Sequence, residues 1–82
     1  MNKVKERIKE VISKSYMSNL SPEEIREEMT LVDDLSFDSL GFVQMILDIE
    51  STFGIKFDEE YVSMDKLVTV KDVINYVEEK TK

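Results

Sequence analysis

Few residues in this chain can interrupt a helix, and that scarcity is the strongest constraint on its fold. The 82 residues include two glycines and one proline, and the proline stands early, at position 22. Because Gly serves left-handed turns and Pro breaks helices, a chain with so few of either is expected to be mostly helical. No β-hairpin signal and no internal repeat is present. We therefore expect one all-α domain over residues 1–82.

Two long helices are predicted from apolar stripes and from their ends. The first runs from about residue 3 to about residue 16, with apolar residues at i, i+4, i+7 and i+8. These residues are Val4, Ile8, Val11 and Ile12. The longest helix starts near Asp38 or Ser39 and ends at Phe53, because Gly54 occupies the usual position of a left-handed carboxyl-terminal cap.

Capping signals predict two shorter helices and a long first loop. Ser21, Pro22 and Glu24 start a turn or two of helix inside the connection that ends at residue 37. Residues 58–60 open a short helix that reaches about residue 64. Thr69 and Asp72 form the capping box of the last helix. Its apolar face comprises Val70, Val73, Ile74 and Val77, and it closes with Lys80 and Lys82. The expectation is four helices, the third of them short.

Charge is distributed unevenly along the chain. The net charge is -7, with five basic and two acidic side chains in residues 1–20 and six basic and sixteen acidic ones in residues 21–82. An acidic body repels nucleic acid and suits partners with basic docking surfaces. The charged segment at residues 1–10 has no apolar run behind it, so no signal peptide or membrane span is expected. We expect a cytoplasmic protein that binds neither nucleic acid nor membrane.

The chain contains no histidine and no cysteine. It therefore lacks the commonest general base, the commonest transition-metal ligand and any thiolate of its own. Residues 33–44 do not place oxygen ligands at alternating positions with glycine at the sixth, which argues against an EF-hand. We expect neither catalytic activity nor a metal site.

The triplet Asp38, Ser39 and Leu40 stands at the start of the longest helix. A hydroxyl there lies beside unpaired backbone N–H groups and the positive end of the helix dipole, a place that favours an anion such as a phosphodiester. Asp38 can cap the helix and leave the Ser39 hydroxyl pointing outward. The alternative is that Ser39 is only a part of the cap.

The apolar arc of the longest helix is unusually wide. It spans about 180° on a helical wheel, whereas a surface helix needs about 100° to meet its core. It comprises Leu40, Phe42, Val43, Ile46, Leu47, Ile49 and Phe53, interrupted by Glu50. We expect Leu40, Val43 and Leu47 to be exposed as a docking patch. The alternative is a helix buried on more than one side.

These segments together resemble one known family. The run Leu35–Leu40 (LSFDSL), with its amphipathic helix ending in Phe53, Gly54 and Ile55, resembles the phosphopantetheine-attachment region of acyl carrier proteins. Residues 4–16, 32–35 and 69–77 are similar to that family's first helix, the turn before its serine and its last helix. The resemblance thus covers nearly the whole chain.

The resemblance implies a right-handed four-helix bundle in which Ser39 receives 4′-phosphopantetheine from coenzyme A, through a phosphopantetheinyl transferase and a divalent cation. Asp38 and Leu40 match flanking positions used in transferase recognition, and Val43, Leu47 and Glu50 match positions that meet partner enzymes. Those partners would be an acyl- or aminoacyl-activating ligase and condensing or acyl-transfer enzymes, with the carrier a monomer. The reactive thiol would arrive on the prosthetic arm, which accounts for the missing cysteine.

Departures from the family bear on the pathway and the cargo. Carriers of primary fatty acid synthesis have acids at several places held here by Gly41, Gln44, Ser51 and Thr52, and a Gly-Ala pair where this chain has Ser36 and Phe37. Residues 54–60 look more like discrete carriers of specialised pathways. Phe42, Met45, Ile46, Ile49 and Phe53 are interpreted as core or as lining of an acyl pocket. Phe37, Phe42, Phe53 and Phe57 either fill a cavity or line one. The alternative function is an acidic helical interaction module in which Ser39 is unmodified or phosphorylated.

Overall fold

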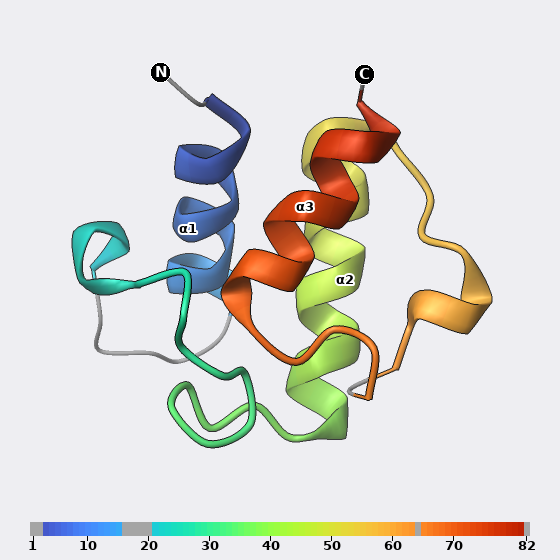
Figure 1. Ribbon diagram of the computed structural model, residues 1–82. Coiled ribbons are helices and arrows are strands. Elements are labelled where there is room, and N and C mark those ends of the chain that lie inside the picture. Colours follow the sequence, from blue (N-terminus) through green and yellow to red (C-terminus); the bar gives the residue numbers. More distant parts are fainter. Residues whose placement is uncertain (1–2, 16–20, 64, 82) are drawn as a thin grey trace.

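In the part of the chain that it describes, the computed structural model contains three α-helices joined by two long connections (Figure 1). It describes residues 3–15, 21–63 and 65–81. The α-helices are α1 (Lys3–Ser15), α2 (Ser39–Phe53) and α3 (Val70–Lys80), and two single turns of 3-10 helix are η1 (Pro22–Glu24) and η2 (Glu59–Tyr61). None of the helices in the described ranges is long and apolar enough to cross a membrane.

The expected all-helical fold is confirmed, but its fourth helix is not. The helix predicted from residue 58 to about residue 64 is only the turn η2, Glu59–Tyr61. The Asp58 side chain does not cap it, because that carboxylate instead accepts a hydrogen bond of 2.9 Å from the Tyr76 hydroxyl. Residue 64 and residue 16, the expected end of the first helix, lie outside the described ranges.

The predicted apolar stripes form the core. Ile8 and Ile12 of α1 are fully buried, with Val4 and Val11 packed partly buried beside them. The predicted face of α3 is also buried, at Val70, Val73, Ile74 and Val77. No polar or charged side chain of the described residues is buried in this core. The hydrophobic effect therefore holds the helices together without buried ion pairs.

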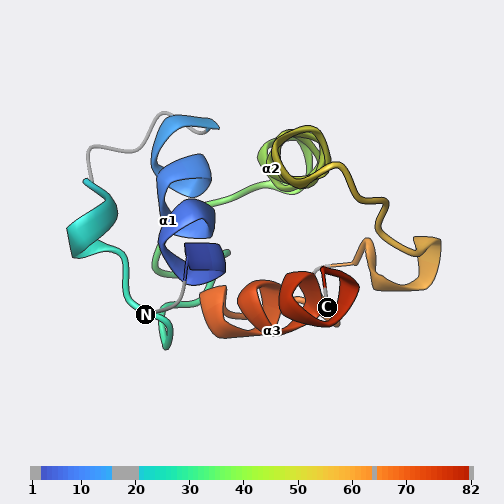
Figure 2. The same cartoon turned by 90° about the horizontal axis from the view of Figure 1, so that it is seen from above.

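The three helices do not pack equally. α1 lies against both α2 and α3, whereas no Cα atom of α2 lies within 8 Å of a Cα atom of α3. Figure 2 shows that the connection between α2 and α3 runs down the side of the molecule opposite α1. The side of the bundle between α2 and α3 is therefore closed by a connecting segment rather than by direct helix packing.

The first connection is fastened to the start of α3. Thr30 and Thr69 form an isolated antiparallel bridge. The N–H of Leu31 donates to the carbonyl of Val68 at 2.9 Å, and the N–H of Val70 donates to the carbonyl of Met29 at 3.0 Å. These bonds hold residues 29–31, on the way into α2, against the start of α3.

Candidate functional site

Asp38 caps the amino terminus of α2, as predicted. Its backbone is extended, and its Oδ1 accepts a hydrogen bond of 2.7 Å from the N–H of Gly41. Ser39 is consequently the first residue of the helix rather than its cap. The Ser39 side chain is exposed, and its hydroxyl forms no hydrogen bond with any residue that the structure describes. Asp38 rather than Ser39 therefore supplies the capping oxygen of α2.

The backbone around Ser39 offers donors to an anion. The carboxylate of Asp38 occupies the N–H of Gly41, and the carbonyl of Asp38 accepts from the N–H of Phe42 at 2.8 Å. The N–H groups of Ser39 and Leu40 have no acceptor within the described parts of the chain. Two free donors at the positive end of a 15-residue helix, with no acid in its first turn, suit a phosphodiester on the neighbouring hydroxyl.

The loop before α2 fixes the direction in which the helix starts. Leu35 and Phe37 are buried, and the N–H of Phe37 donates to the carbonyl of Leu31 at 2.8 Å. Between them, Ser36 has a φ of 60°, the left-handed region that favours glycine. Two anchors on either side of a left-handed residue turn the chain so that Asp38 reaches its capping position.

The outer row of the predicted docking patch is exposed, as expected. Leu40 is 79% exposed, Val43 is 44% exposed and Leu47 is 52% exposed. The inner face of the same helix is buried, at Phe42, Met45, Ile46 and Ile49. The wide apolar arc therefore divides into a core face and an exposed face, and the helix is not buried on more than one side. We call Leu40, Val43 and Leu47 the α2 patch.

Glu50, which interrupts that arc, has a structural role that the sequence did not predict. It is half-buried, and its Oε2 accepts a hydrogen bond of 2.7 Å from the backbone N–H of Phe57. This carboxylate ties the end of α2 to the connection that follows Gly54. Gly54 itself takes the predicted left-handed conformation, with a φ of 67°.

A second cluster of polar and aromatic groups fastens that connection to α3. The Tyr76 hydroxyl donates to Asp58 Oδ2 at 2.9 Å and accepts from the Asp58 N–H at 2.8 Å. Lys80 Nζ lies 3.1 Å from the same carboxylate oxygen. The hydrogen bond from Tyr76, followed by that from Lys80, lowers the pKa of Asp58. Burial is the main cause that raises the pKa of Tyr76. Sequence reasoning missed this cluster because its partners stand far apart in the chain.

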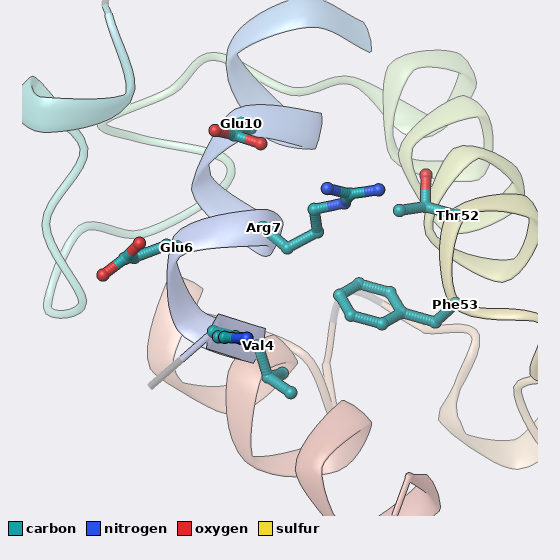
Figure 3. Close-up of a pocket in the computed structure, with 7 residues that line it drawn as sticks. Val4, Glu6, Arg7, Glu10, Thr52 and Phe53 are labelled. Carbon is teal, nitrogen blue, oxygen red and sulfur yellow. The ribbon is translucent and has the colours of Figure 1, made fainter. Parts of the chain in front are cut away.

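A surface groove lies between α1 and the carboxyl-terminal end of α2 (Figure 3). The Arg7 side chain reaches from α1 toward Thr52 and Phe53, with Val4 below it. Thr52 stands about 20 Å along the helix axis from Ser39, at 1.5 Å per residue. The groove therefore lies at the opposite end of α2 from Ser39. Phe53, interpreted from the sequence as core or acyl-pocket lining, is one of its lining residues, whereas the predicted attachment and docking residues are not.

Comparisons with known proteins agree with this geometry. Residues 2–77 match the family model described as a phosphopantetheine attachment site. The acyl carrier protein of Buchnera aphidicola is 40% identical over 82 residues, covering 100% of this chain and 99% of that protein. The acyl carrier protein of Thermotoga maritima is 36% identical over 74 residues, covering 90% of this chain and 86% of that protein.

A solved structure from Mycobacterium tuberculosis, assigned as an acyl carrier protein, has the same fold. It superposes with a TM-score of 0.81 at 30% identity, covering 93% of this chain and 96% of that one. The family match and these relatives define a carrier with a site for a covalent prosthetic group. The chain belongs to the acyl carrier protein family, and its cofactor is a covalently attached 4′-phosphopantetheine.

Proposed function

We propose that Ser39 is the attachment residue and that the protein shuttles acyl or aminoacyl intermediates between enzymes. The observation that supports this most is that Asp38, and not Ser39, caps α2. The Ser39 hydroxyl is therefore exposed and forms no hydrogen bond with the described residues. The attached arm supplies the thiol that holds the cargo as a thioester. The free N–H groups of Ser39 and Leu40 orient the phosphodiester at its base.

The α2 patch is proposed as the surface that partner enzymes recognise. Leu40, the most exposed of its three residues, stands next to Ser39 and is suited to the transferase that loads the arm. Apolar residues with acids around them match partners that present apolar sockets and basic rims. We include Glu50 in this surface, because its Oε1 accepts no hydrogen bond from the residues described.

The exposed face of α2 also bears on which enzymes the carrier meets and in which pathway. We propose a phosphopantetheinyl transferase, an acyl- or aminoacyl-activating ligase and condensing or acyl-transfer enzymes as partners of a cytoplasmic, monomeric carrier. The outer positions of α2 held by Gln44, Ser51 and Thr52 are exposed and uncharged. A weaker acidic field on this helix favours dedicated partners of a specialised pathway over those of primary fatty acid synthesis.

Intact-protein mass spectrometry tests the attachment. The chain is incubated with coenzyme A, magnesium and a broad-specificity phosphopantetheinyl transferase, beside Ser39→Ala. The proposal predicts a gain of one phosphopantetheine on the parent chain and none on the variant. No gain on folded protein with several transferases would overturn it and would favour an acidic interaction module instead.

A further inference from the structure

Buried side chains of the connecting segment join the core alongside α2 and α3. The two helices approach no closer than 8 Å between Cα atoms, and the connection after Gly54 covers the side between them (Figure 2). Two residues of that connection, Phe57 and Leu67, belong to the buried core together with the inner faces of both helices. We call this side of the molecule the α2–α3 seam.

Phe57 is held in the seam from both helices. It is only 7% exposed. On the α2 side, Glu50 Oε2 accepts its N–H at 2.7 Å. On the α3 side, its ring stacks on the ring of Tyr76, with centroids 4.7 Å apart and planes inclined by 21°. The charge-assisted hydrogen bond fixes the backbone of Phe57, and the stacking contact orients its ring.

Tyr76, on which the Phe57 ring stacks, makes several further contacts. Its ring also packs against the ring of Tyr61, with centroids 4.8 Å apart, and Lys80 Nζ lies 5.7 Å from the centre of the Tyr76 ring. The Tyr76 hydroxyl is locked by its two hydrogen bonds with Asp58. The ring on which Phe57 stacks is therefore tied to the connection at both Asp58 and Tyr61.

We infer that Phe57 excludes cargo from the bundle, so that this carrier holds its thioester outside and is suited to short or polar acyl units. The inference rests on the proposed attachment at Ser39. Protein interiors are close-packed, and a long apolar chain entering the seam would have to displace a buried ring that stacks on Tyr76 and whose own backbone N–H is bound by Glu50. A short or polar unit gains little from burial and needs no such displacement.

The test compares acetyl and octanoyl thioesters of the holo-protein. In the parent chain, the methyl NMR shifts of Ile46 and Ile74, which lie in the buried faces of α2 and α3, are expected to be the same with both cargoes. The two forms are also expected to unfold at the same temperature. Octanoyl-dependent shifts of these methyl groups, or a higher unfolding temperature with octanoyl, would overturn the inference.

Two variants open the seam and one serves as a matched control. Phe57→Ala and the milder Phe57→Val should admit the octanoyl chain, so that the octanoyl form shifts these methyl groups and unfolds at a higher temperature than the acetyl form. Phe53→Ala removes a phenylalanine that faces the groove of Figure 3, away from the seam, and should show no dependence on cargo. Octanoyl dependence in the control but not in the Phe57 variants would contradict the role of Phe57. Failure to load Ser39 at all, seen in the mass of the protein, would instead refute the proposed function on which the inference rests.

Discussion

The Asp38 carboxylate accepts a 2.7 Å hydrogen bond from the N–H of Gly41, and this bond frees the hydroxyl of the intervening Ser39. A serine at the start of a helix commonly caps it, with its hydroxyl oxygen accepting a hydrogen bond from a backbone N–H. Here the preceding residue does so instead. The first turn of α2 thereby combines a fixed backbone with an accessible hydroxyl, which is the combination that covalent modification needs.

Replacing Asp38 tests its role as the cap of α2. Asp38→Ala should lower the free energy of unfolding by about 1 kcal/mol, because the N–H of Gly41 loses its acceptor. Asp38→Asn keeps a capping oxygen and should recover most of that loss. Urea denaturation monitored by circular dichroism measures both. Equal stability of the alanine variant and the parent would contradict the assigned cap.

Leu47 tests whether the α2 patch serves partners rather than the fold. Because its side chain is 52% exposed, Leu47→Ala should change the free energy of unfolding by less than about 1 kcal/mol. Ile49→Ala, two positions later on the buried face, should cost about 2–5 kcal/mol. The loading rate with a transferase should fall for Leu47→Ala, measured at low carrier concentration. A Leu47 variant as unstable as the Ile49 variant would place Leu47 in the core instead.

Ser36 is expected to be a position where glycine improves stability. Its φ of 60° disfavours any side chain with a Cβ atom, so Ser36→Gly should raise the free energy of unfolding by up to about 1 kcal/mol. Ser36→Val should lower it, because branched side chains fit this conformation worst. The exposed Ser51 inside α2 is the control, where the change to glycine should destabilise. Thermal unfolding of the three variants tests the sign of each effect.

The pKa of Asp58 predicts an acid-dependent loss of stability. Its hydrogen bonds from Tyr76 and Lys80 lower its pKa below the ordinary value of 3.8. A carboxyl with a lowered folded-state pKa stabilises the protein above its unfolded-state pKa, and this contribution disappears as the pH falls through the folded value. Asp58→Asn should therefore flatten the dependence of stability on pH below about 4. Asp58 and Lys80 are accessible to solvent, so salt should weaken the part of the effect that comes from their ion pair. An unchanged acid profile in the variant would contradict the assignment.

The caps of α2 and α3 were predicted correctly from the sequence, because each cap depends on residues that lie close together in the chain. The cap of α3 is built as expected, with the Asp72 N–H donating to Thr69 Oγ1 and the Thr69 N–H donating to Asp72 Oδ2. Both partners lie within one helical turn, so their spacing alone identifies them. The Asp38 cap and the left-handed Gly54 were predictable for the same reason.

The short turn at Asp58 and the structural role of Glu50 were not predicted, because both depend on contacts between residues far apart in the chain. Asp58 resembled a helix start, but Tyr76, 18 positions later, competes for its carboxylate, and only one 3-10 turn forms. Glu50 resembled a docking acid, although it also accepts the N–H of Phe57, seven positions later. No periodicity or capping rule connects such pairs, because the tertiary fold brings them together.

The most direct test of the central claim is to locate the arm on the loaded protein. After treatment with coenzyme A and transferase, the protein is digested and its peptides are fragmented in a mass spectrometer, beside Ser36→Ala as a control that removes the neighbouring hydroxyl. The account predicts phosphopantetheine on Ser39 alone and full loading of the Ser36 variant. An arm on Ser36 or on any other hydroxyl, with Ser39 unmodified, would contradict it.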